Sequence, residues 1–204
     1  MASHKLLEII GRSDIAKITN GVFVEIGSSR EENVRQSSTY YFYKKCKARK
    51  IEFLSVDFAK ESYLKAKKIA GTNAVHMDGK EFLINYKRFS KKPISLLYLD
   101  NFDVVYNLRH KKSLLRRVGN TYKKLGQSIT NRRSAEVHYQ QVRAALPHMA
   151  KSAVIIFDDT YLISNRSFWG KGSKSIPYLL KTTKFRIKGI GHEGFLMANF
   201  PLKN

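Results

Sequence analysis

The sequence predicts an α/β fold built on a mostly parallel seven-stranded sheet that ends in an antiparallel pair of strands. Five short apolar runs alternate with helical patterns, as expected where helices connect parallel strands. The last two runs are separated only by Gly191-His192-Glu193, a link too short for a parallel crossover. The strands are expected in the segments 22–29, 51–57, 72–79, 94–103, 153–160, 185–190 and 194–200.

Composition limits the class of protein. A chain of 204 residues can bury one sizeable core, so we expect a single domain over residues 1–204. It has no apolar run long enough to span a membrane and no signal-peptide pattern, and its one cysteine, Cys46, excludes a disulfide framework and a Cys-based zinc site. We therefore expect a cytoplasmic protein without a membrane partner.

The charge is strongly positive. The chain carries 38 Lys and Arg against 16 Asp and Glu, a formal net charge of +22. Such a chain attracts polyanions, so nucleic acid and phosphorylated substrates are candidate partners. A basic solvated surface without a specific partner explains the same composition.

The stretch from Val22 to Ser29 predicts a buried strand, a tight turn and the start of a helix. Glu25 lies within the apolar strand, and Gly27 allows the backbone to turn sharply and a ligand to approach. A dinucleotide site needs two further glycines, which are missing here, and acids follow Ser28 and Ser29 where a pyrophosphate would bind. This pattern disfavours NAD and FAD and favours a ligand with a cationic centre and no phosphate.

An acid also ends the second predicted strand. Asp57 stands some thirty residues after Gly27, at the position from which a carboxylate accepts both hydroxyls of a ribose. Phe58, the next residue, could lie against an adenine. The alternative is that Asp57 caps the helix expected at 60–70. Asp78, in the third segment, falls at the same edge of the sheet.

Further acids follow the fourth and fifth strands. Asp100 and Asp103 come after the fourth, and Asp158 and Asp159 end the fifth. Parallel neighbours bring these groups together, for binding or catalysis, or as a capped turn in which Asp159 pairs with a lysine. Between them, residues 104–133 form a basic insertion without an acid, which could cover a substrate or bind an anion.

Helices are expected between these strands. Ser134 can cap a helix that carries His138 near the ligand edge, and Pro147 ends it. The remaining expectations are an N-terminal helical lead-in at 1–20, helices at 30–48, 60–70 and 174–181, and a glycine loop at 168–173.

Together these features resemble the class I S-adenosylmethionine (SAM) methyltransferases, whose first motif is a strand ending in E/D-x-G-x-S/G. The resemblance covers about 22–200 and implies a Rossmann-like fold with SAM as cofactor. The residues assigned to SAM are Glu25, Gly27, Ser28, Ser29, Asp57, Phe58, Asp78, Gly79 and Asp100.

Within that fold, the segments Leu99–Asp103 and Phe157–Thr160 look like the metal-dependent O-methyltransferases of the catechol and macrocin types. This resemblance implies Mg²⁺ on Asp100, Asp158 and Asp159, with Asp100 and Asp158 also catalytic. The ion would bind a substrate hydroxyl and lower its pKa. His138 or Lys171 would act as base or orienting group, although His138 is equally explained as a core or capping residue.

Three functions remain open from the sequence. The first is SAM-dependent methylation of a hydroxyl on a small or anionic substrate. The second is methylation of RNA, and the third is nucleic-acid binding by an inactive relative, in both cases through the basic insertion. No N-P-P-Y-type tetrapeptide follows the fourth strand, where Asp100-Asn101-Phe102-Asp103 stands, which argues against an adenine or cytosine N-methyltransferase.

Overall fold

The computed structural model of the protein describes residues 12–28, 33–101, 120, 122–123, 126, 128–164, 167–191 and 194–201. Ser29, Asp103 and most of the basic insertion lie outside these ranges, so the predictions made for them stay predictions. None of the helices within the ranges has the length and apolar character that crossing a membrane requires.

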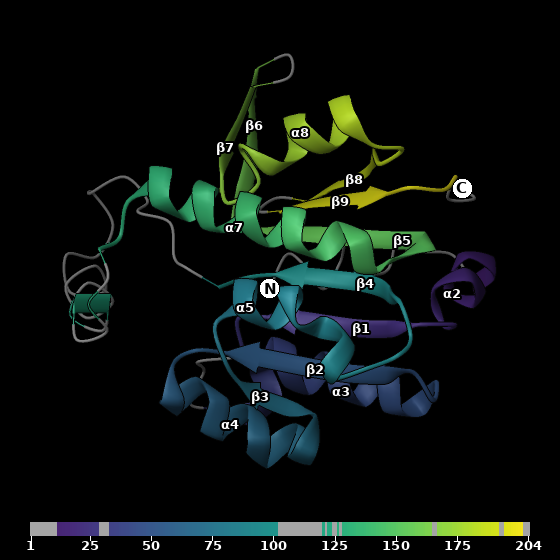
Figure 1. Ribbon diagram of the computed structural model, residues 1–204, viewed down its shortest axis with the longest axis vertical. Helices are drawn as coiled ribbons and strands as arrows, with labels where there is room; N and C mark the ends of the chain where they lie inside the picture. The colour runs from purple at the N-terminus through teal and green to yellow at the C-terminus, as the bar shows by residue number, and fades with distance from the viewer. Residues whose placement is uncertain are drawn as a thin grey trace.

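A seven-stranded sheet forms the centre of the structure, with the strand order β3-β2-β1-β4-β5-β9-β8 (Figure 1). The first five strands are parallel, and β9 runs antiparallel to both β5 and β8. The predicted α/β sheet with its antiparallel end is therefore confirmed. The strands are β1 (Val22–Ile26), β2 (Glu52–Asp57), β3 (Ala74–His76), β4 (Ile94–Leu99), β5 (Met149–Asp158), β8 (Arg186–Gly191) and β9 (Gly194–Ala198).

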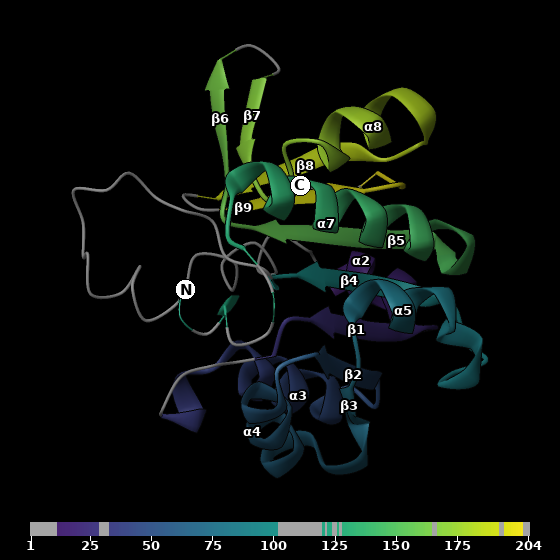
Figure 2. The same cartoon turned by 60° about the vertical axis from the view of Figure 1, so that its left-hand side comes forward.

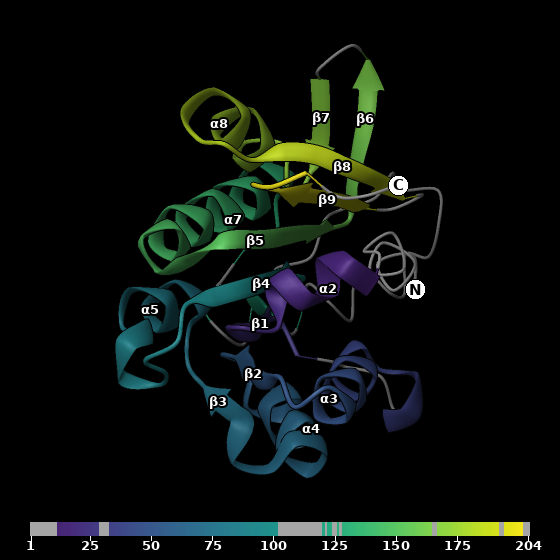
Figure 3. The same cartoon turned by 90° about the vertical axis from the view of Figure 1, so that its right-hand side faces the viewer.

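Helices cover both faces of this sheet (Figure 3). One core contains residues of α2, α3 and α4, and the other contains residues of α5, α7 and α8. Short 3₁₀ turns lie at 34–36, 71–73, 86–88 and 146–148. The helices are α2 (Arg12–Ile18), α3 (Ser38–Ala48), α4 (Lys60–Ala70), α5 (Gly79–Ile84), α7 (Asn131–Ala145) and α8 (Ser175–Thr182).

The central strands are buried on both faces, which explains their continuous apolar sequences. In β1, Val24 faces the α5–α7 core and Phe23 faces the α2–α3 core. The Phe42 ring of α3 packs edge-on against Phe23 and Tyr98, at centroid distances of 4.7 and 4.9 Å. Burying each such side chain contributes roughly 1.5–3 kcal/mol, so these contacts fix the sheet between its helical layers.

Two helices begin elsewhere than predicted. Helix α7 starts one turn earlier, because the Thr130 hydroxyl accepts the Arg133 N–H at 3.1 Å and takes the capping role expected of Ser134. Helix α3 starts only at Ser38, where the side chain of Ser37 accepts the N–H of Tyr40.

The glycine loop expected at 168–173 is instead partly a strand. Residues Thr160–Ser164 (β6) and Ser167–Gly170 (β7) pair as an antiparallel hairpin that projects from the sheet (Figure 2). The run of β-branched and aromatic residues after Asp159 favours this pairing. The prediction missed it because the run continues directly from the fifth strand.

Gly27 lies at the point where the chain changes direction across the sheet. The chain passes from β3 across to β4, so β1 and β4 are neighbours, and ligands of open α/β sheets bind at such a point. Gly27 has φ +97°, and a Cβ there would lie 2.6 Å from the carbonyl carbon of Asp100. The turn therefore requires glycine both for its backbone angle and for its contact with the exit of β4.

We expect Gly27→Ala to lower the free energy of unfolding more than Gly71→Ala does, as measured by urea denaturation. Gly71 also has positive φ, but no atom lies within 4 Å of a Cβ placed there. Gly71→Ala should therefore cost only the backbone strain, about 1 kcal/mol. Gly27→Ala should cost roughly 1–3 kcal/mol more, the price of overpacking. Equal losses would show that the exit of β4 moves aside without cost.

Candidate active site at the carboxyl edge of the sheet

The turn after β1 is tied to the end of β2. The Ser28 N–H donates to Asp57 Oδ2 at 2.8 Å, and the hydroxyls of Ser28 and Ser55 lie 2.8 Å apart. Asp57 Oδ1 accepts the N–H of Ala59 at 2.7 Å. Asp57 thus orders the backbone after β1 and after β2 at the carboxyl edge of the sheet.

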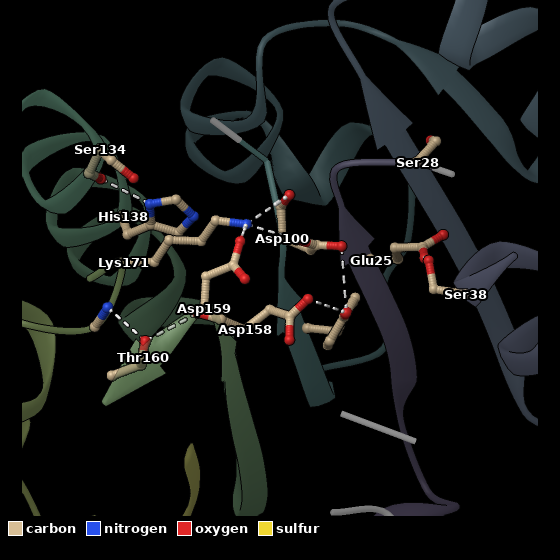
Figure 4. A network of polar contacts seen from close by, with 12 residues as sticks. Glu25, Ser28, Ser38, Asp100, Ser134, His138, Asp158, Asp159, Thr160 and Lys171 are labelled. Atoms are coloured by element: carbon tan, nitrogen blue, oxygen red, sulfur yellow. Dashed lines mark hydrogen bonds and ion pairs between the residues drawn. The ribbon is translucent and has the colours of Figure 1, made fainter. Parts of the chain in front are cut away.

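Glu25 lies beneath this turn and is fully buried. The hydroxyls of Ser38 and Ser55 donate to its two carboxylate oxygens at 2.7 and 2.6 Å. Burial raises the pKa of Glu25 to about 7, although these hydrogen bonds oppose the shift. Because Ser38 is the first residue of α3, its contact with Glu25 links β1 to that helix (Figure 4).

Three other residues assigned to SAM lie along the same edge. Asp78 caps α5, since its Oδ1 accepts the N–H groups of Lys80 and Glu81 at 2.8 and 3.0 Å. A Cβ on Gly79 would lie 2.7 Å from the amide nitrogen of Gln141, so α5 and α7 pack closely there. Phe58 packs beside Tyr122, with ring centroids 6.4 Å apart, and Tyr122 belongs to the basic insertion.

The three acids predicted to meet at the ends of β4 and β5 do meet. Asp100, Asp158 and Asp159 each offer an oxygen, and these oxygens all lie within 4.8 Å of one another. We call these three residues the acid cluster. Their oxygens are the ligand type that Mg²⁺ prefers, but three carboxylates so close together repel unless a cation balances them.

Lys171 supplies a cation inside the acid cluster (Figure 4). Its ammonium nitrogen lies 2.6 Å from Asp100 Oδ1 and 2.8 Å from Asp159 Oδ2. It also donates to the backbone carbonyl of Asp100 at 3.2 Å, and its side chain has no exposed surface. Burial and the two neighbouring carboxylates raise the pKa of Asp100, and Lys171 opposes that shift. The pairing of Asp159 with a lysine is the alternative that the sequence left open.

The β6–β7 hairpin carries Lys171 to this position. The Lys171 N–H donates to the carbonyl of Asp159 at 3.1 Å, and the Gly172 N–H donates to the hydroxyl of Thr160 at 2.9 Å. Gly170 has φ +94°, and a Cβ there would overlap the carbonyl oxygen of Asp159. The hairpin therefore closes tightly on the end of β5 and returns Lys171 to its partner.

Tyr98 is a further member of the site that the sequence did not reveal. Its hydroxyl lies 3.1 Å from Asp158 Oδ2 and 3.3 Å from Asp100 Oδ2. One hydroxyl proton can serve only one of these oxygens at a time. The only signal in the sequence was an aromatic residue with a polar tip two positions before Asp100, which is also typical of a core strand.

His138 faces the same site from α7 (Figure 4). Its Nδ1 lies 2.7 Å from the carbonyl of Ser134, while its buried Nε2 meets no hydrogen-bond partner among the described residues. Burial, helped by the positive charge of Lys171, lowers the pKa of His138 to about 3. The imidazole is therefore neutral near pH 7, with a proton on Nδ1 directed at Ser134.

No protein-family model and no curated protein matches this chain. Among solved structures, it is similar to a candidate rRNA methylase from Clostridium thermocellum, at 11% identity and a TM-score of 0.48 over 92% of this chain and 94% of the other. It is also similar to a candidate methyltransferase from Streptococcus mutans in complex with SAH, at 8% identity and a TM-score of 0.49 over 95% and 94%. At these levels of identity and structural similarity, neither structure identifies a function for this chain. Its function has to be inferred from its own residues.

The buried Glu25 predicts a pH dependence of stability. The pKa of Glu25 in the folded protein, about 7, exceeds the ordinary value of 4.5. Between these two pH values the folded protein holds a proton that the unfolded chain has released. Stability from this group should be complete below about pH 4.5 and should fall by roughly 3 kcal/mol as the pH rises through about 7.

We expect Glu25→Gln to remove this fall, because an amide does not ionise, and its oxygen can accept from one serine hydroxyl while its NH2 group donates to the other. Urea denaturation across the same pH range measures the free energy of unfolding of both proteins. Glu52→Gln is the control, since it removes a carboxylate from the neighbouring strand that pairs with Lys92 at 3.5 Å. A pH profile that Glu25→Gln leaves unchanged would contradict the raised pKa.

Proposed function

We propose that this protein is a SAM-dependent methyltransferase that acts on a hydroxyl group. The observation that carries the proposal is the Gly27 turn, which packs against the exit of β4 where the strand order reverses. Carboxylates flank this turn on both sides, Asp57 from β2 and the acid cluster from β4 and β5. An edge with carboxylates placed in this way suits a ligand that carries positive charge and lacks phosphate.

The residues around the turn fit the adenosine part of SAM. In this proposal Asp57, which binds the N–H groups of Ser28 and Ala59, also accepts the ribose hydroxyls. Phe58 lies against the adenine. Asp78, at the same edge of the sheet, accepts a hydrogen bond from the adenine amino group. When bound, SAM supplies a methyl group on a positively charged sulfur, and methyl transfer leaves a neutral thioether.

The acid cluster fits the removal of a proton from the acceptor. Lys171 is bound to Asp100 and Asp159, whereas Asp158 contacts the hydroxyl of Tyr98. In this proposal Asp158 accepts the proton of the substrate hydroxyl while that oxygen forms its bond to the methyl carbon, and the electron pair of the broken carbon–sulfur bond stays on sulfur. Tyr98 and Lys171 hold the carboxylates in place.

His138 takes a positioning role in this proposal. With a pKa of about 3, the imidazole is a weak base near neutral pH. Its ring packs α7 against Lys171 and shields the ammonium from water, which strengthens the ion pairs there.

We expect the protein to bind SAH, the stable product of SAM, in isothermal titration calorimetry. Asp57→Ala should weaken binding by about 1–3 kcal/mol, the cost of leaving the ribose hydroxyls unpaired. Asp14→Ala is the matched control, because Asp14 is a buried acid on α2 that pairs with Lys17 at 3.1 Å. Wild-type protein that binds NADH but not SAH would contradict the proposal.

A second candidate is methylation of RNA, which a basic surface on α3 and α4 favours. None of the eight cations that form it pairs with a carboxylate within the described parts of the chain, and all are exposed. Lys45 and Lys47 lie over the rings of Tyr41 and Tyr43, at 5.5 and 5.9 Å. The α3–α4 surface consists of Lys44, Lys45, Lys47, Arg49, Lys50, Lys60, Lys67 and Lys68.

If RNA is the partner, the logarithm of its affinity should fall linearly with the logarithm of salt concentration in fluorescence anisotropy. A quadruple variant of the α3–α4 surface should flatten that slope by about 0.7 for each lost phosphate contact. The changes are Lys44→Gln, Lys47→Gln, Lys67→Gln and Lys68→Gln.

A control variant removes the same charge from exposed lysines elsewhere, by Lys80→Gln, Lys87→Gln, Lys91→Gln and Lys181→Gln. It should leave most of the slope intact. If both variants flatten the slope equally, RNA responds to net charge and the α3–α4 surface is not a binding site. Absence of binding at low salt would exclude RNA as the substrate.

A further inference from the structure

We infer that Lys171 is the permanent cation of the acid cluster, so that this protein works there without the divalent metal ion that the residue pattern suggests. The inference concerns the ion that balances the cluster, and it stands whether or not the protein transfers a methyl group. It offers a cation from the chain itself in place of the Mg²⁺ predicted on Asp100, Asp158 and Asp159.

The ammonium group of Lys171 has as many acceptors as it has N–H donors. An ammonium has three N–H donors, and Lys171 meets three acceptors, which are Asp100 Oδ1, Asp159 Oδ2 and the carbonyl of Asp100. Two of these are charge-assisted contacts at 2.6 and 2.8 Å, the short distances of strong ion pairs. Lys171 thus engages two of the carboxylate oxygens that a metal ion at the acid cluster could use.

The closed β6–β7 hairpin holds Lys171 inside the acid cluster. Its side chain has no exposed surface, and its own N–H is bound to the carbonyl of Asp159. On either side, Gly170 packs on the backbone of Asp159, and the Gly172 N–H is bound to Thr160. Opening this loop would remove the ammonium and leave the carboxylates of Asp100 and Asp159 without their counter-ion, which costs several kcal/mol.

A metal ion at the acid cluster would also be repelled by Lys171. The ammonium already lies among the carboxylates, and a second cation bound to their oxygens would lie close to it. Like charges at that distance repel strongly where water is excluded. Removing the ammonium while keeping the carboxylates should therefore convert the cluster into a metal site.

The experiment is a titration of metal-stripped protein with Mn²⁺, followed by electron paramagnetic resonance of the free ion. We expect wild-type protein to bind no Mn²⁺ at the cluster. Lys171→Met, which keeps the length of the side chain and loses the charge, should bind Mn²⁺ at least about tenfold more tightly than wild type, as expected when a repelling charge is removed. Mn²⁺ should also raise the melting temperature of this variant alone.

Matched variants define the site. Lys174→Met makes the same change three residues away, where the lysine is half exposed and pairs with Glu136 at 2.6 Å, and it should gain no Mn²⁺ binding. Lys171→Met combined with Asp159→Asn should lose the gain, because one of the three carboxylates is then an amide. A gain that persists in this double variant would overturn the inference.

Two further results would overturn it. One is a wild-type protein that binds Mn²⁺ with an affinity lost in Asp158→Asn, because a metal would then displace the lysine. The other is a folded Lys171→Met that gains no binding. If Lys171→Met does not fold, the wild-type titration decides: binding sensitive to Asp158→Asn overturns the inference, and no such binding supports it. Calorimetry with SAH tests the proposed function separately, since neither result predicts the other.

Discussion

The buried ammonium of Lys171 holds together the half of the edge formed by β4, β5 and the hairpin. It bridges the acid that follows β4 to the acid that follows β5, at 2.6 and 2.8 Å. Asp159 has φ +44°, an uncommon angle for a residue with a side chain, and its carbonyl accepts the N–H of Lys171. This backbone strain is tolerated because Asp159 binds Lys171 twice, through its carbonyl and through its carboxylate, and so holds the hairpin in place.

The other half of the edge depends on Asp57 in a comparable way. There the partners of the carboxylate are backbone N–H groups of Ser28 and Ala59, not a charged side chain. Gly27 stands between the two halves, in contact with the backbone after β4. One carboxylate orders the turn after β1, and a lysine with two carboxylates orders the chain after β4 and β5, so this edge of the sheet is held in place by the protein's own contacts.

The sequence was sufficient to predict the features that follow from strand order. Acids at the ends of neighbouring parallel strands had to meet, and Asp100, Asp158 and Asp159 do so. Lys171 could be named from the sequence but not placed, because its position depends on a hairpin whose pairing is non-local. Tyr98 was hidden for a different reason, since its ring serves the core and only its hydroxyl serves the site.

The charges of this protein are distributed unevenly. The chain has 16 acids against 38 basic residues, yet six of those acids lie in or just after β1 to β5: Glu25, Asp57, Asp78, Asp100, Asp158 and Asp159. Their charge is partly offset, because burial raises the pKa of Glu25 to about 7 and Lys171 pairs with Asp100 and Asp159. Because exposed charges are screened beyond about 10 Å at moderate salt, this edge of the sheet and the exposed cations of α3 and α4 act separately on charged molecules. In the proposed function, a positively charged donor at this edge and an anionic acceptor on α3 and α4 would therefore not compete for the same surface.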